Sequence, residues 1–73
     1  MQKRGVLRSL GSELRRRRQA RDLSQEALAH AAGVHVNVVG RLERGQYNPS
    51  ILLLQAVVSK LDVPLSEIFA AIE

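Results

Sequence analysis

The stretch between positions 36 and 44 combines side chains that can recognise nucleic-acid bases. If it is a helix whose apolar side turns inward, its outward face carries Val36, Asn37, Gly40, Arg41 and Arg44. In the major groove of DNA, an asparagine amide pairs with adenine, a guanidinium group pairs with guanine, and an apolar side chain meets a thymine methyl. We therefore predict that Val36, Asn37, Gly40 and Arg41 contact base edges.

Two of these residues also allow a simpler interpretation. A glycine inside an exposed helix costs about 1 kcal/mol relative to alanine, so Gly40 either permits close approach to DNA or is a neutral surface position. Arg41 either contacts a base or is an exposed arginine with no role. Arg44 lies near the end of the stretch, where a phosphate contact or an interaction with the negative end of the helix is expected.

A second group of residues is expected beside the DNA backbone. Ser24 can cap a helix, and the free N–H groups of the following turn, at Gln25, favour a phosphate. The alternative is that Gln25 makes no contact. His35 precedes the next helix and is a helix cap, a phosphate contact or neither. The predicted phosphate-contacting set is Ser24, Gln25, His35, Arg44, Tyr47 and Asn48.

Glycine and proline divide the chain into helical segments, and strand-like alternation is absent. We predict five helices, over about residues 9–21, 25–32, 36–44, 51–61 and 64–69. Residues 1–8 are expected to be a basic N-terminal segment with freedom to move, and residues 9–73 one domain. The tight turn at Gly33 prevents an antiparallel arrangement, so the second and third helices cross at roughly 90–120°, as in a helix-turn-helix.

Composition narrows the functional classes. The 73 residues carry a net charge of +4, and residues 1–22 hold eight basic and two acidic side chains. This basic stretch suits a polyanion such as nucleic acid, and equally a solvated helix. Cysteine is absent, which excludes disulfides and thiolate metal sites. No apolar run approaches the roughly 20 residues of a membrane span, so we expect no membrane partner and a cytoplasmic location.

Opposite charges border the expected core at Arg18 and Glu43. Arg18 lies one turn after Leu14 on the apolar stripe of the first helix, and Glu43 follows Leu42 on the third. Because a lone buried charge is costly, the two residues should pair. We predict that this structural ion pair fixes the first helix against the third.

Several segments together resemble the XRE family of phage repressor and Cro-type helix-turn-helix proteins. They are Leu23-Ser24-Gln25-Glu26-Ala27-Leu28-Ala29, Ala32-Gly33-Val34, Arg41-Leu42-Glu43-Arg44-Gly45 and Asn48-Pro49-Ser50. The resemblance implies a compact, all-α, five-helix lambda-repressor-like domain with its third helix in the major groove. It also implies DNA-contacting roles for Gln25 and for residues 37–41, and the pair described above. Among short relatives the chain looks like the controller proteins of restriction-modification systems. It departs from the family at Asp22 and Asp62, where glycine is common.

Members of this family are usually homodimers on palindromic operators, and surplus apolar residues suggest where two copies would meet. In the run 51–54, Ile51 and Leu54 match the inward phase of a helix, which leaves Leu52 or Leu53 outside. The predicted dimer interface is Leu52, Leu53, Leu65, Ile68 and Ile72. The alternative is incidental surface leucine, which is common in monomers.

The sequence therefore predicts a homodimeric transcriptional regulator that binds specific double-stranded DNA. One alternative is an antitoxin that binds a toxin and represses its own promoter, so RNA polymerase or a toxin is a potential protein partner. Another is a protein that coats DNA by charge alone. An enzyme is not expected, because paired carboxylates and a glycine-rich phosphate loop are missing and the two histidines lack partners. No cofactor or metal is expected.

Overall fold

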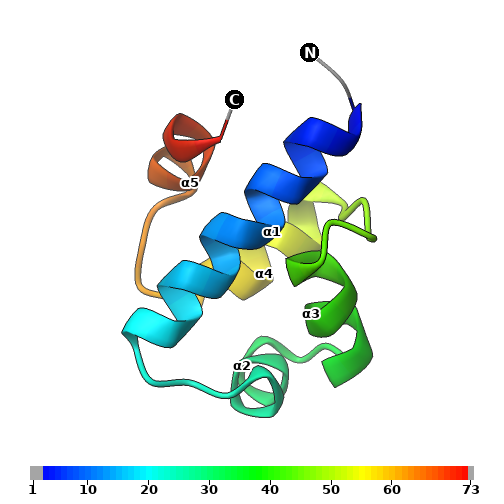
Figure 1. Ribbon diagram of the computed structural model, residues 1–73. Coiled ribbons are helices and arrows are strands. Elements are labelled where there is room, and N and C mark those ends of the chain that lie inside the picture. Colours follow the sequence, from blue (N-terminus) through cyan, green and yellow to red (C-terminus); the bar gives the residue numbers. More distant parts are fainter. Residues whose placement is uncertain (1–2, 73) are drawn as a thin grey trace.

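The computed structural model describes residues 3–72, which form five helices joined by short loops (Figure 1). These are α1 (Lys3–Ala20), α2 (Gln25–Ala32), α3 (Val36–Glu43), α4 (Ile51–Ser59) and α5 (Leu65–Ala71). The predicted all-helical, five-helix fold is confirmed over this range. Three boundaries differ from the prediction by two residues or more. Helix α1 begins well before Ser9, so the expected division at residue 8 falls inside a helix; α4 ends before Leu61; and α5 continues past Phe69 to Ala71.

Serine side chains begin α2 and α4. The Ser24 hydroxyl accepts a hydrogen bond from the Ala27 N–H at 3.0 Å, and the Ser50 hydroxyl accepts one from the Leu53 N–H at 3.1 Å. Each bond satisfies a backbone donor that the helix itself cannot. These caps fix where the two helices start.

Helices α1, α2 and α3 end in the same kind of turn, with one residue in the left-handed conformation. After α1 this residue is Asp22, with φ 57°, and the Leu23 N–H donates to the Arg18 carbonyl at 3.2 Å. Gly33 and Gly45 take the equivalent places after α2 and α3, with φ 71° and 73°. The pattern is the Schellman motif, which normally favours glycine.

Asp22 should therefore be a strained position that glycine relieves. We expect the free energy of unfolding of Asp22→Gly to exceed that of Asp22→Ala by about 1 kcal/mol, because a β-carbon is disfavoured in the left-handed region. Urea denaturation measures this difference. Both variants remove the same carboxylate, so they form a matched pair. Equal stability of the two variants would contradict the left-handed conformation at this residue.

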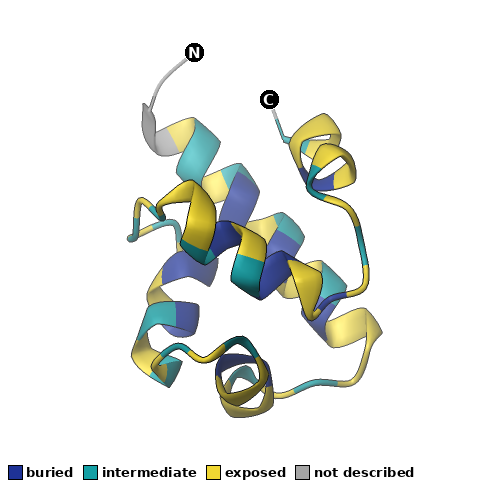
Figure 2. Cartoon of the chain, turned by 180° about the vertical axis from the view of Figure 1, so that it is seen from behind, coloured by how far each residue is buried: buried dark blue, intermediate teal, exposed yellow. Residues whose placement is uncertain are grey.

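The core gathers the inward faces of the five helices (Figure 2). Its buried apolar residues are Leu10, Leu14, Leu28, Ala29, Val39, Leu42, Leu54, Val57, Val58, Leu61 and Ile68. The inward orientation predicted for Leu54 on α4 is confirmed. The same prediction was wrong for Ile51, which is 58% exposed because the first turn of α4 borders an open apolar hollow rather than the core.

Helix α1 lies very close to the C-terminal end of α3 at Gly11. This residue is buried, and a β-carbon at its position would lie 2.8 Å from the carbonyl carbon of Glu43 and closer still to the Leu42 carbonyl oxygen. Glycine therefore allows the backbones of the two helices to touch. This contact helps to set the position of α3 on the body of the protein.

An ion pair joins α5 to α1. Arg17 lies between two carboxylates, with its Nε 2.7 Å from Glu13 and its Nη1 2.7 Å from Glu67. Hydrogen bonds from Arg16 and Arg17 lower the pKa of the Glu13 carboxyl below its ordinary value. Ile68 follows Glu67 on α5, and its side chain is fully buried in the core.

Candidate nucleic-acid interface

Helices α2 and α3 cross at one end of the molecule, with α3 on its outer edge (Figure 1). The turn between them is held by the Val34 N–H, which donates to the Ala29 carbonyl at 3.0 Å. Ala29 is buried and Ala32 packs on the core, so small side chains of α2 face the crossing. The tight turn and the small residues leave the opposite side of α3 facing solvent.

That side of α3 carries most of the predicted base-contacting residues. Asn37 and Arg41 are exposed, and Val36 is half-buried against the core. Together with the start of α2 they enclose a hollow of about 440 Å³. Its lining residues are Gln25, Glu26, Val36, Asn37, Gly40, Arg41 and Arg44. The fold thus brings residues from two helices to one polar, concave surface.

Gly40 does not present a bare backbone to solvent. It is buried, and a β-carbon there would lie 3.2 Å from Arg44 Nη1 and 3.7 Å from Gln25 Oε1. The description of Gly40 as an exposed position was wrong, because side chains from α2 and from the end of α3 fold over it. Close approach of DNA to this glycine requires Gln25 or Arg44 to move.

Gln25 is tied to the core rather than free. Its Nε2 donates a hydrogen bond to Glu43 Oε1 at 3.0 Å. Its carbonyl oxygen is the atom that faces Gly40. The predicted phosphate contact at Gln25, through the free backbone N–H groups of this turn, stays a prediction. The hydrogen bond to Glu43 orients the side-chain amide at the start of α2.

The predicted ion pair between Arg18 and Glu43 is present and buried. Arg18 Nε lies 2.7 Å from Glu43 Oε2 and Nη2 lies 3.0 Å from Oε1, so the contact is bidentate. Arg18 Nη1 also donates to the Leu23 carbonyl at 2.7 Å. Hydrogen bonding to Glu43 raises the pKa of Arg18. The pair connects α1 and α3 directly behind the surface that carries Gln25.

Arg41 lies beside Tyr47. Its guanidinium carbon is 5.6 Å from the centre of the tyrosine ring, within cation–π range, and its Nη2 lies 3.4 Å from the Gln46 carbonyl oxygen. Tyr47 is half-buried and packs on the core. The packed tyrosine ring therefore restricts where the Arg41 guanidinium can lie. The phosphate contact predicted for Tyr47 stays a prediction.

The other predicted phosphate contacts lie at helix starts and in a loop. Ser24, His35 and Asn48 are exposed. The His35 Nδ1 accepts a hydrogen bond from the Asn37 N–H at 3.1 Å, so the helix-cap alternative is the one that forms. In this arrangement His35 has only Nε2 to offer a phosphate, and the Ser24 hydroxyl is occupied as a cap acceptor but can still donate.

Two residues at this surface were missed from the sequence. Glu26 lines the hollow and adds a negative charge to it. Gln46 accepts from Arg41 through its carbonyl and from Arg44 Nε, at 3.2 Å, through its side chain. The position of Glu26 in the first turn of α2 could have indicated its place at this surface. The position of Gln46 could not, because the contacts of Gln46 depend on the turn after α3.

The exposed apolar residues differ from the predicted dimer patch. Leu52 is 75% exposed, and Leu53, Leu65 and Ile72 are half-buried. The assignment of Ile68 to an interface was wrong, because α5 turns its apolar stripe onto its own core and leaves this side chain 0% exposed. Among the described residues, the large apolar side chains that do face solvent are Ile51, Leu52 and Phe69.

No helix formed by residues 3–72 has the length and apolar character that crossing a membrane requires. Nor do the described residues contain a cluster of histidine, aspartate and glutamate suited to a metal ion.

Known proteins share this arrangement. Residues 14–68 match the helix-turn-helix family HTH_3. The HTH-type transcriptional regulator SutR of Escherichia coli (strain K12) is 36% identical over 61 residues, which are 84% of this chain and 34% of SutR. The uncharacterized HTH-type transcriptional regulator YazB of Bacillus subtilis (strain 168) is 31% identical over 58 residues, 80% of this chain and 84% of YazB. The chain therefore spans a minor part of SutR and most of YazB.

A solved structure extends the likeness to three dimensions. The crystal structure of the restriction-modification controller protein C.AhdI from Aeromonas hydrophila superimposes with a TM-score of 0.84 at 40% identity. The match covers 86% of this chain and 96% of C.AhdI.

Proposed function

The chain belongs to the XRE-type helix-turn-helix family, and on that basis we propose that it is a sequence-specific, double-stranded DNA-binding transcriptional regulator. The observation that carries the proposal is the outer face of α3. Asn37 and Arg41 are exposed there, beside the capped N-terminus of α2. Amide and guanidinium groups are the ones that distinguish base pairs in the major groove.

In this proposal α3 enters the major groove and the start of α2 faces the phosphate backbone. Asn37 lies in the first turn of α3, where base contacts usually fall in this motif. Helix α2 begins at Gln25 with backbone N–H groups that can donate to a phosphate. Arg18 and Glu43 act behind the interface, since their bidentate contact holds α3 against α1.

We also propose that the protein binds a palindromic operator as a homodimer. Ile51, Leu52 and Phe69 are exposed apolar residues of α4 and α5, outside the face of α3 that would meet DNA, and a second copy could bury them. A homodimer on a palindromic operator would place its two α3 helices on successive major grooves, about 34–36 Å apart. The likeness to C.AhdI favours, as a narrower candidate, a controller of a restriction-modification system.

Arg41→Ala tests the proposed base contact. The variant should lose about 1–3 kcal/mol of discrimination at one base pair of each half-site, because a bidentate guanidinium contact would be missing. Binding is compared on a preferred duplex and on duplexes with single substitutions. Arg21→Ala is the matched control, since it removes an exposed arginine that pairs with Asp62 at the far end of α1. Unchanged affinity and unchanged sequence preference in Arg41→Ala would refute the assignment.

A further inference from the structure

A recess between α1 and the turn after α3 brings two arginines together. It has a volume of about 340 Å³ and is lined by Arg8, Arg44, Gly45 and Gln46. Arg8 comes from the first half of α1, in a part of the chain that the sequence suggested was a mobile segment. The recess therefore forms because the first half of α1 is helical and passes beside the end of α3.

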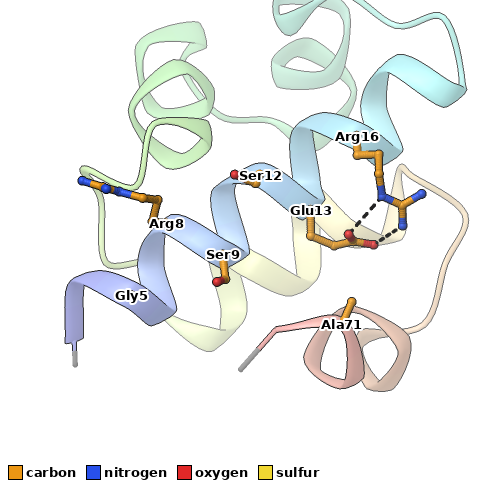
Figure 3. A pocket seen from close by; sticks show the side chains of 7 residues that line it. All are labelled: Gly5, Arg8, Ser9, Ser12, Glu13, Arg16 and Ala71. Atoms are coloured by element: carbon orange, nitrogen blue, oxygen red, sulfur yellow. Dashed lines mark hydrogen bonds and ion pairs between the residues drawn. The ribbon is translucent and has the colours of Figure 1, made fainter. Parts of the chain in front are cut away.

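Close backbone packing fixes this geometry. Gly45 has φ 73°, and a β-carbon at its position would lie 2.9 Å from the Cα of Arg8. The turn after α3 therefore rests directly on the backbone of α1 at Arg8. Figure 3 shows the Arg8 side chain directed away from Glu13 and Arg16, which pair with each other.

The charges of the recess are not balanced within the described part of the chain. Arg16, Arg17, Arg18 and Arg21 each pair with a carboxylate. Neither Arg8 nor Arg44 has a carboxylate of a described residue within salt-bridge distance, and the lining contains no acidic residue. Two like charges on one small recess repel each other unless an anion lies between them. Guanidinium groups also match phosphate oxygens in geometry.

The recess adjoins the surface proposed to meet DNA. Arg44 lines both this recess and the hollow over Gly40, and its Nη1 lies above that glycine. An anion held between Arg8 and Arg44 would therefore sit next to the outer face of α3. A phosphate of the same DNA is the anion that this continuity favours.

We propose that Arg8 and Arg44 together bind one backbone phosphate of the DNA, and that Arg8 is a DNA-contacting residue of α1. This inference rests on the proposed function and adds a contact outside the helix-turn-helix. The recess fixes register and contributes affinity without reading sequence, as phosphate contacts do.

The salt dependence of binding to a short duplex of arbitrary sequence tests the proposal, because phosphate contacts do not depend on sequence. Arg8→Ala should reduce the slope of log K against log salt by about one between about 50 and 200 mM salt. Arg8→Lys should keep the slope, since the charge remains. Arg16→Ala is the matched control and should also keep it, because Arg16 lies on α1 but faces Glu13. An unchanged slope in Arg8→Ala would overturn the proposal.

A double variant tests whether the two arginines share one phosphate. If they do, the affinity loss of Arg8→Ala/Arg44→Ala should be smaller than the product of the two single losses. Multiplicative losses would overturn the shared site. A free phosphate ion could occupy the recess in place of a DNA phosphate, and inorganic phosphate is the probe for this alternative. Saturable binding of inorganic phosphate that depends on Arg8, together with an unchanged slope on DNA, would show a free-anion site and overturn the DNA contact.

Failure of this inference is distinguishable from failure of the proposed function. If the wild-type protein prefers one sequence and Arg8→Ala leaves the salt slope unchanged, the proposed phosphate contact is refuted and the proposed function stands. If the wild-type protein binds all duplexes equally, the proposed sequence-specific function is refuted, whatever the effect of Arg8→Ala.

Discussion

Glu43→Ala should lower the free energy of unfolding by about 3–5 kcal/mol, because it leaves the Arg18 guanidinium buried without its counter-charge. In the folded protein the side chain of Arg18 is only 10% exposed, and both oxygens of Glu43 accept hydrogen bonds from it. Gln25 would lose its partner as well. Chemical denaturation at neutral pH measures the loss.

Glu67→Ala is the matched control for this prediction. Glu67 also pairs with an arginine of α1, at 2.7 Å, but its side chain is 54% exposed. Such surface pairs contribute about 0–1 kcal/mol. A loss below about 0.5 kcal/mol for Glu43→Ala, similar to that of a surface pair, would contradict the role of Glu43 in holding α3.

Gly11→Ala should be the second strongly destabilising change. The added methyl group would meet the backbone carbonyl groups of Leu42 and Glu43, which cannot rotate away as a side chain does. Overpacking of this kind typically costs about 1–3 kcal/mol and sometimes more. Because α1 must shift relative to α3, DNA binding should weaken as well. Thermal and urea unfolding measure the first effect, and titration with a duplex measures the second.

Gly5→Ala provides the control on the same helix. Apart from its chain neighbours and the backbone of its own helix, no atom of the described residues lies within 4 Å of the position that its β-carbon would take. Alanine favours a helix over glycine by up to about 1 kcal/mol, so this variant should be as stable as the wild type or more so. If Gly11→Ala were equally harmless, the close approach of α1 to α3 would be wrong.

Local signals in the sequence predicted much of the fold. The Ser24 cap and the Gly33 turn depend on residues close together in the chain, and both form as expected. The Arg18–Glu43 pair was predictable as well, because two opposite charges at the edge of one small core have few other partners. These features follow from helix periodicity, capping and the cost of burying a charge.

The errors concern residues whose surroundings depend on how whole helices pack. Gly40 is covered by side chains that reach over it from α2 and from the end of α3. Ile68 is buried because α5 folds back on α1, and Ile51 is exposed because it lies at the first position of α4. Nothing local indicates the recess of Arg8, which requires α1 to pass beside the turn at Gly45.

The claim that the outer face of α3 reads a DNA sequence can be tested by selection of bound duplexes from a random DNA pool. The wild-type protein should enrich one motif, with two half-sites whose centres lie about one helical turn apart. Arg41→Ala should enrich the same motif with one position of each half-site relaxed. Retained binding at low salt with no enriched motif would contradict the claim, because it would show attraction by charge alone.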